Sequence, residues 1–334
     1  MSRKSVFAIV SLIVFLACLI LFAPGCRKTA EPNLPKETAQ KKITIGVCMS
    51  TFTSPYASAT VRELKRYTQE KGYGVIILDS QLDIQREAYN IENLMSRKVD
   101  IIIVNVVDSE GSRAALKKAA GTGFAVISSG STVNRPEVIG IRAYTGSNYY
   151  DEAVVAAREA IKRKPDGKVV MITGTPGYSA VIEREKGFTD TISKEAPGMK
   201  ILDIQSGNWM REEAQTVMSG FITKYGNKID IVYAHDDNMA AGAVAALKAA
   251  GYVLENKPIV LSIGAMADGL PLVKEGWIDS TCLQSPKEEG RLAVDTGINI
   301  INGRQKESYK NYFLNTPPVD KSNVQEVIEM HIWD

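Results

Sequence analysis

Short, almost continuous runs of apolar residues recur along the chain from residue 43 onward. They lie at residues 43–49, 74–79, 100–105, 124–129, 168–173, 200–205, 229–234, 258–263 and 278–284. In each run, apolar residues occupy successive positions instead of alternating with polar ones. Successive side chains of a strand point to opposite faces of the sheet, so this pattern indicates strands buried on both faces, as in parallel sheets. Four runs precede residue 145 and five follow it, so the sequence predicts two similar halves, each with its own sheet.

Amphipathic helical patterns separate these runs. The clearest covers residues 211–225, where apolar residues fall at helical spacing and charged residues are left for solvent. A second, alanine-rich pattern runs from Met239 to Ala250 and stops at Gly251, a residue that commonly ends helices. Alternating strands and helices predict an α/β fold, in which each half is a doubly wound parallel sheet with right-handed crossovers.

The first 25 residues have the pattern of an export signal. Arg3 and Lys4 precede an apolar and small-residue run from Val6 to Ala23, and Ala-Pro-Gly then leads into Cys26. A basic start, an apolar core and a small-residue cleavage site are typical of secretory signals. The ending resembles a bacterial lipobox, whose cysteine is acylated and becomes the mature N-terminus. An uncleaved transmembrane anchor is the alternative, because the run approaches the roughly 18 residues that span a bilayer.

Residues 26–41 contain prolines and charges and almost nothing apolar. Such a segment cannot bury enough surface to offset the entropy lost on ordering, so we expect a flexible stalk, lipid-anchored through Cys26. The body of the protein would then be extracytoplasmic and membrane-anchored, in the periplasm or on the outer face of the cell membrane. The remaining residues suffice for two lobes.

Charge and cysteine content narrow the class of partner. The net charge of +2 comes from Arg3 and Lys4, so the rest of the chain is neutral overall and has no long basic run. This argues against a nucleic-acid partner. Cys48 and Cys282, the two cysteines of the body, lie within apolar runs, and we expect them to be buried free thiols.

Common catalytic and nucleotide-binding motifs are absent from the sequence, including the phosphate loop, the dinucleotide fingerprint, the nucleophile elbow and the zinc-protease pair. His235 follows a strand beside Asp236 and Asp237, but no nucleophile accompanies them. Of this pair, we expect Asp237 to cap the next helix and Asp236 to face the ligand cleft beyond the strand ends. We therefore expect no enzyme activity, no cofactor and no metal site.

Four segments carry a resemblance to a known family. They are SPY at 54–56, GYGVIILDSQ at 72–81, GTPGYSAVIEREKGF at 174–188 and VYAHDDNMAAGAVAAL at 232–247. With the export signal and the two sheets, they resemble the periplasmic ribose/galactose-type binding proteins, the type I solute-binding receptors of ABC importers. The resemblance covers residues 42–315. It implies two lobes joined by a three-segment hinge and a monomer that passes a small polar ligand to an ABC transporter permease.

The resemblance also implies ligand contacts. Ser54 corresponds to a polar contact and Tyr56 to a ring that stacks on a sugar, with Trp209 as the opposing aromatic residue. Arg184 matches an arginine that donates a fork of hydrogen bonds to sugar oxygens. The remaining implied contacts are polar side chains that follow other strands, namely Ser131, Tyr178, Asp236 and Gln284.

Two positions depart from the family pattern. Gly130-Ser131 stands where an acidic or amide residue followed by arginine or lysine is usual, and Gly264 stands where an aspartate is usual. Without these side chains we expect more room in the cleft and fewer hydroxyl acceptors. The ligand could then be a sugar, a modified sugar or a nucleoside.

The expected lobes are discontinuous in sequence, with crossings near Thr145, Gln284 and Tyr312. The first would comprise residues 42–145 and 285–312, and the second residues 146–284 and 313–334. Two other functions stay open. One is a sensory receptor of the same fold that signals to a membrane kinase or chemoreceptor, and the other is an exported, lipid-anchored enzyme.

Overall fold

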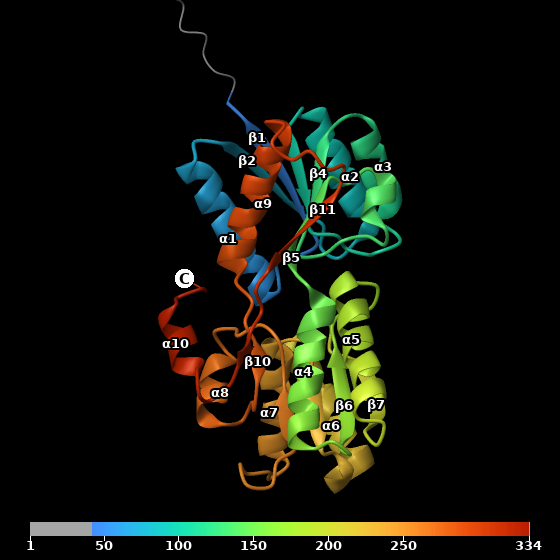
Figure 1. Ribbon diagram of the computed structural model, residues 1–334, viewed down its shortest axis with the longest axis vertical. Helices are drawn as coiled ribbons and strands as arrows, with labels where there is room; N and C mark the ends of the chain where they lie inside the picture. The colour runs from blue at the N-terminus through green and yellow to red at the C-terminus, as the bar shows by residue number, and fades with distance from the viewer. Residues whose placement is uncertain (1–41, 334) are drawn as a thin grey trace, which may run out of the picture. The chain divides into compact units, whose positions relative to one another are not determined.

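The computed structural model describes residues 42–333, which form two α/β lobes (Figure 1). The expected signal, Cys26 and the stalk lie outside the described residues. The fold confirms the predicted α/β class with parallel sheets. Within residues 42–333, no helix combines the length and the apolar character that a bilayer crossing requires.

The first lobe is built on a six-stranded parallel sheet in the order β11-β5-β4-β3-β1-β2. Its strands are β1 (Thr44–Met49), β2 (Gly74–Asp79), β3 (Ile101–Val104), β4 (Ala125–Ser129), β5 (Ala143–Ser147) and β11 (Lys310–Leu314). Four of them coincide with predicted runs. The two other strands, β5 and β11, were not predicted, and they extend the sheet at one edge.

Helices cover both faces of this sheet. They are α1 (Pro55–Glu70), α2 (Ile84–Ser96), α3 (Arg113–Gly121) and α9 (Pro286–Ile301), with a short 3₁₀ turn, η1 (Pro136–Ile139). Ile45 and Val47 of β1 pack with α1 and α9, whereas Cys48 packs on the opposite face with α2 and α3. Side chains that point alternately to the two faces are thus buried on both, which explains the continuous apolar runs.

The second lobe is built on a four-stranded parallel sheet in the order β7-β6-β8-β9. Its strands are β6 (Lys168–Thr173), β7 (Lys200–Ser206), β8 (Ile231–Ala234) and β9 (Ile259–Leu261). A small antiparallel pair, β10 (Thr281–Cys282) and β12 (Pro318–Val319), lies beside it. The run at 278–284 is therefore a strand only at its centre.

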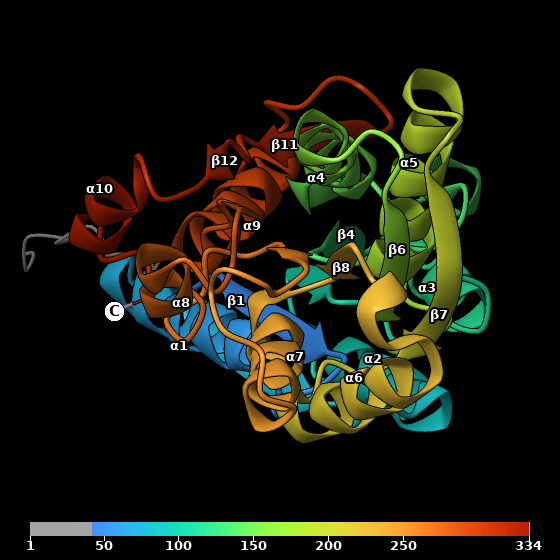
Figure 2. The same cartoon turned by 90° about the horizontal axis from the view of Figure 1, so that it is seen from below.

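The helices of the second lobe also form two layers (Figure 2). Residues of α4 (Tyr149–Arg163) and α5 (Ser179–Glu195) share one core, and residues of α6 (Arg211–Tyr225) and α7 (Asp237–Ala249) share the other. The lobe is completed by α8 (Leu270–Glu275), α10 (Val324–Glu329) and a 3₁₀ turn, η2 (Gly226–Lys228). The helix α6 has the bounds that its apolar spacing predicted.

The chain passes between the lobes at three places: between β5 and α4, between β10 and α9, and between β11 and β12. After the second crossing, α9 returns to pack against α1, and β11 pairs with β5. The strands β5 and β11 run on to Ser147 and Leu314, slightly past the expected crossings. Cys48 and Cys282 are both buried free thiols.

Candidate functional site

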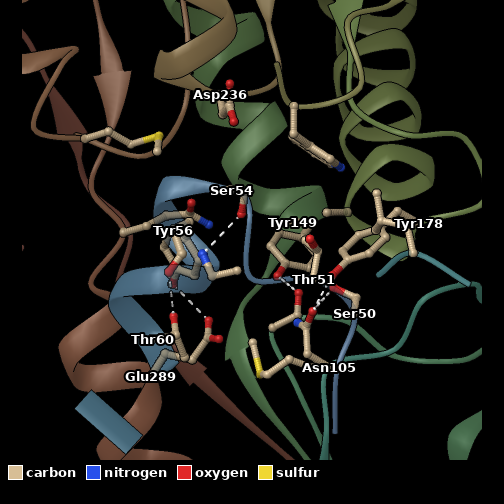
Figure 3. A pocket seen from close by; sticks show the side chains of 18 of the residues that line it. Ser50, Thr51, Ser54, Tyr56, Thr60, Asn105, Tyr149, Tyr178, Asp236 and Glu289 are labelled. Carbon is tan, nitrogen blue, oxygen red and sulfur yellow. Dashed lines mark hydrogen bonds between the residues drawn. The ribbon is translucent and has the colours of Figure 1, made fainter. Parts of the chain in front are cut away.

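A cavity lies where the carboxyl ends of the two sheets face each other. Its empty volume is about 690 Å³, counting solvent at its mouth. Residues that follow β1, β3 and β4 line it from the first lobe, and residues that follow β6, β7, β8 and β9 line it from the second. Figure 3 shows Asp236 entering from one side, opposite Tyr56, Thr60 and Glu289. Strand ends in parallel sheets are where ligands usually bind.

The structure brings together seven of the eight side chains that the sequence assigned to a ligand. The residues in the cavity wall are Ser54, Tyr56, Tyr178, Arg184, Trp209, Asp236 and Gln284. Ser131 is outside the wall, which corrects its assignment. Its hydroxyl is buried, donates to the carbonyl of Val106 at 2.8 Å and lies 3.2 Å from the hydroxyl of Ser179. Ser131 therefore joins elements of the protein to each other.

Arg184 forms a buried ion pair. Its Nε and Nη2 atoms donate to Oε2 of Glu152 at 3.2 and 2.8 Å, and Nη1 donates to the carbonyl of His235 at 2.6 Å. The second oxygen of Glu152 accepts from Gln284 at 2.9 Å. The guanidinium also stacks over the ring of Tyr149, 4.9 Å from its centroid. Of five guanidinium N–H groups, one on each terminal nitrogen is left for a ligand.

The two aromatic residues expected to sandwich a sugar are each held by another ring. Tyr56 meets Trp333 edge-on at 5.7 Å, and Trp209 meets Tyr178 edge-on at 6.0 Å. The backbone of Trp209 is left-handed, with φ of +63°, and the amide of Asn238 donates to its carbonyl at 2.8 Å. These contacts fix both rings in the cavity wall and leave little side-chain entropy to lose on binding.

Tyr178 links the two lobes directly. Its hydroxyl lies 2.6 Å from that of Ser50, after β1, and it also donates to the side-chain oxygen of Asn105, after β3. The neighbouring backbone contributes, because the carbonyl of Gly177 accepts from the amide of Ser109 at 3.0 Å. The residues that lead into α5 therefore dock on the first lobe, and the Tyr178 hydroxyl is engaged in that contact.

Asp236 both caps α7 and lines the cavity. Its Oδ1 accepts from the amide of Met239 at 2.7 Å. Burial first, and then the charge of Asp237, raise the pKa of Asp236 to about 7, although the amide of Met239 lowers it. Asp236 thus lies in the cavity wall as expected, whereas the expectation that Asp237 caps the helix was wrong.

Asp237 has a structural role instead. It is fully buried, and it accepts hydrogen bonds from the hydroxyls of Ser262 and Thr281 at 2.5 and 2.6 Å and from the amide of Met266 at 2.6 Å. These bonds tie α7 to the segments around β9 and β10. His235 is also fully buried, and burial lowers the pKa of its imidazole well below the usual value, so it is neutral.

Several cavity residues carried no assigned ligand contact, above all Glu289 on α9. This side chain is 2% exposed, and its Oε2 accepts from the Tyr56 hydroxyl at 2.9 Å. A signal was available, because Glu289 lies four residues before the buried Ala293, on the apolar face of the helix. The other wall residues to which no individual ligand contact was assigned are Met49, Ser50, Thr51, Ala57, Thr60, Leu82, Asn105, Gly130, Tyr149, Ala180 and Met266.

The space beside the two unusual glycines is occupied. A Cβ at Gly130, where φ is +65°, would collide with Oε1 of Glu289 and lie 2.9 Å from the side-chain nitrogen Nδ2 of Asn105. A Cβ at Gly264, where φ is +130°, would lie 2.8 Å from the side chain of Met266. The expectation of extra room and fewer acceptors is corrected at Gly130, because Glu289 supplies a carboxyl there from another element.

The family follows from comparison with known proteins. The sequence model of the periplasmic binding protein domain matches residues 45–305, well over half of the chain. The chain belongs to the periplasmic binding protein family. This binding protein is 27% identical over 303 residues to the ribose import binding protein of Bacillus subtilis, across 91% of this chain and 95% of the relative.

Solved structures agree with this relationship. The binding protein superposes with a TM-score of 0.80 on an ABC transporter solute-binding protein from Bacillus halodurans with bound myo-inositol, which is 26% identical, across 88% of this chain and 100% of that one. It also resembles the fructose-binding periplasmic domain of a hybrid two-component system, with a TM-score of 0.78 and 26% identity, across 87% and 95% of the two chains. The expected type I receptor architecture is thereby confirmed.

Among residues 42–333, no group of three or more histidine, cysteine, aspartate or glutamate side chains is placed to hold a metal ion. The polar groups that the described part of the cavity presents are hydroxyls, amides, two carboxyls and one guanidinium. Such a set forms hydrogen bonds with a polyhydroxylated molecule, and the rings of Tyr56 and Trp209 add apolar surface against which such a molecule packs.

Proposed function

We propose that this protein is an extracytoplasmic receptor that captures a small sugar-like molecule in the interlobe cavity and delivers it to an ABC transporter. One observation carries the proposal: hydrogen-bonding groups and aromatic rings from both lobes converge on one cavity in a member of the periplasmic binding protein family. The relatives named for ribose import and for bound myo-inositol support a polyhydroxylated ligand. We expect a monomer that does no chemistry on its ligand and binds no nucleic acid.

The proposed mechanism is closure around the ligand. Ser54 and Tyr56 belong to the first lobe, whereas Trp209 and Asp236 belong to the second. A ligand touches both sets only when the lobes are together, so it binds the closed arrangement more tightly and shifts the population toward it. The transporter would then recognise the closed pair of lobes.

We also propose the division into lobes and the anchoring. The lobes are residues 42–145 with 285–312, and residues 146–284 with 313–334. The packing of α9 against α1 and the pairing of β11 with β5 support the return of the chain to the first lobe. Residues 1–25 are proposed as a signal peptide and Cys26 as the acylated residue that anchors a stalk of residues 26–41, on the basic and apolar pattern alone.

A sensory receptor is the second candidate, because one structural neighbour is a periplasmic domain of a hybrid two-component system. Such a receptor would use the same cavity and closure, but its partner would be a membrane kinase or chemoreceptor. An exported enzyme is less well supported, since His235 is buried and outside the described cavity wall.

Recovery of the natural ligand tests the proposal. The full chain is purified under native conditions and then denatured, and released small molecules are identified by mass spectrometry. Each candidate is titrated back by calorimetry. A polyol or sugar that binds at micromolar or lower concentration supports the proposal. Failure of every recovered molecule and of a panel of monosaccharides to bind would contradict it.

A further inference from the structure

One oxygen of Glu289 lies in the cavity wall without a hydrogen bond. The carboxyl is held by Tyr56 through Oε2, whereas Oε1 accepts no hydrogen bond from residues 42–333. Oε1 lies beside the backbone of Gly130, itself a wall residue. Oε1 is not among the oxygens sealed off without a partner in the described part of the chain, so it faces the cavity and can accept a hydrogen bond from a ligand there.

The cavity has more acids than bases. Arg184 is the one basic side chain in the wall that the structure describes, and its charge is already paired with Glu152. The charge of Arg184 also acts on Asp236, whereas no cation acts on Glu289 among the described wall residues. An anionic ligand would meet two carboxyls, whereas a cationic ligand would supply the counterion that an ionised Glu289 lacks.

The pKa values reflect this imbalance. Burial first, and then the charge of Glu152, raise the pKa of Glu289 to about 8, although the hydrogen bond from Tyr56 lowers it. The titratable and charged groups that act on it from other elements are Tyr56 on α1, Tyr144 on β5, Tyr149 and Glu152 on α4, and Tyr178 at the N-cap of α5, while Arg184 on α5 is the cation of the described cavity wall. Only Arg184 is a cation, and Glu152 neutralises it.

We propose that the ligand is a polyhydroxylated ring that bears a protonated amine, such as an amino sugar or amino cyclitol, and that its ammonium group pairs with Glu289. This inference rests on the proposed function and narrows its ligand class. An ammonium supplies donors for the open Oε1 atom, and a charge-assisted hydrogen bond is roughly twice as strong as a neutral one. The ring hydroxyls then meet Asp236 and the free N–H groups of Arg184 across the cavity.

This pairing couples binding to a proton. Glu289 is mostly protonated at pH 7 because its pKa is about 8, and the ammonium favours the ionised carboxylate. Binding at pH 7 therefore releases up to one proton. Affinity rises as the pH increases from 6 toward 8, until the amine itself loses its proton.

Matched sugar pairs test the inference. The full chain is titrated by calorimetry with D-glucose and D-glucosamine, D-galactose and D-galactosamine, D-mannose and D-mannosamine, and myo-inositol and its amino derivative. In at least one pair the amine binds roughly tenfold or more tightly than the hydroxyl compound, by the worth of a charged hydrogen bond. Its binding enthalpy at pH 7 also differs between phosphate and Tris buffers, because the buffer takes up the released proton and the two buffers differ in their enthalpy of protonation.

The outcomes separate this inference from the proposed function. Neutral members that bind as tightly as the amines, or more tightly, would overturn the inference and leave the receptor function intact. A complete lack of binding by every member of all pairs would overturn both. Amine binding with an enthalpy independent of buffer would overturn the pairing with Glu289.

Variants locate the effect. Glu289→Gln keeps a hydrogen-bond acceptor for Tyr56 but removes the charge, so the affinity ratio of amine to hydroxyl compound falls to near one and the buffer dependence disappears. Glu288→Gln is the matched control, because Glu288 is the preceding residue on α9 and is exposed, and it leaves both readouts unchanged. A merely structural role for Glu289 would weaken both members of a pair equally, which would contradict the proposal.

Discussion

Arg184 illustrates how one residue can serve both the ligand and the fold. The resemblance assigned its guanidinium to sugar oxygens, whereas the structure commits three of its N–H groups to Glu152 and His235. The side chain is 3% exposed and Glu152 is fully buried. Because both charges are almost entirely buried, each depends on the other.

Removal of Arg184 should therefore destabilise the protein. In Arg184→Ala, Glu152 stays buried without its cation, and we expect the free energy of unfolding to fall by about 3–5 kcal/mol. Urea unfolding at neutral pH measures this. Arg158→Ala is the control, because its pair with Glu195 is exposed and should be worth about 0–1 kcal/mol. Similar small losses in both variants would contradict a structural role for Arg184.

Individual cavity residues were predictable where a strand end or a family motif marked them. Tyr56 and Trp209 were placed correctly in the wall by that reasoning. Glu289 was not, because an acid in the first turn of a helix usually faces solvent and interacts with the helix dipole. The cap was assigned to Asp237 instead of Asp236 because two adjacent carboxyls fit a cap equally well, and only the packing of Ser262 and Thr281 around Asp237 decides between them.

At the scale of elements, the N-terminus of α7 places a carboxyl group in the cavity wall. Asp236 is its cap residue, and burial keeps the pKa of that carboxyl near 7. An aspartate in an unfolded chain has a pKa of about 3.9. The folded state therefore holds a proton that the unfolded state has lost at intermediate pH, and the contribution of Asp236 to stability declines as the pH rises from about 4 to about 7.

Asp236→Asn should remove this dependence. Asparagine caps helices as well as aspartate does, so the variant should match the parent near pH 4.5. At pH 7.5 it should be more stable than the parent by about 1–3 kcal/mol, since it carries no buried charge. Urea unfolding of both proteins at the two pH values is the measurement. A difference that stays constant with pH would contradict the raised pKa.

The N-terminal end of α5, capped by Tyr178, joins the two lobes beside the cavity. The Tyr178 hydroxyl reaches Ser50 and Asn105 on the first lobe. In Tyr178→Phe these bonds are lost and the closed arrangement loses about 1–2 kcal/mol, so ligand affinity should fall by roughly fivefold to thirtyfold. Calorimetry measures this with a ligand recovered from the protein.

The control for this variant is Tyr150→Phe, which removes a hydroxyl whose bond to Asp190 is exposed. Its affinity should match that of the parent. Unchanged affinity in Tyr178→Phe would mean that the contact between Tyr178 and the first lobe does not contribute to closure.

Elements with continuous apolar runs were predicted well, and the exceptions have a physical reason. The strand β5 is fully buried, but its sequence AYTGS contains hydroxyl residues and a glycine, so it lacks the continuous apolar pattern of the other buried strands. The strand β11 lies at the sheet edge with most of its side chains partly or fully exposed. Its place depends on pairing with β5 rather than on its own apolar content, and pairing between distant segments is not encoded in local pattern.

At the scale of the whole molecule, the anchoring proposal depends on Cys26, outside the described residues. If this cysteine is acylated, a serine in its place cannot carry the lipid. We expect Cys26→Ser either to release soluble protein or to accumulate as an unprocessed precursor. Fractionation of cells and labelling with a radioactive fatty acid distinguish these results from the parent. If the variant and the parent are both membrane-bound, uncleaved and free of lipid, the transmembrane anchor is favoured.

The return of α9 and β11 to the first lobe sets the order in which the chain can fold. Tyr67 on α1 bonds to Asp295 on α9 across 228 residues of sequence, whereas the strands of the second sheet follow one another from β6 to β9. A chain that emerges N-terminus first cannot complete its first lobe until almost all of it has been made. Contacts between such distant segments form slowly. The first lobe therefore stays incomplete through most of synthesis, which would suit the export that the N-terminal pattern predicts.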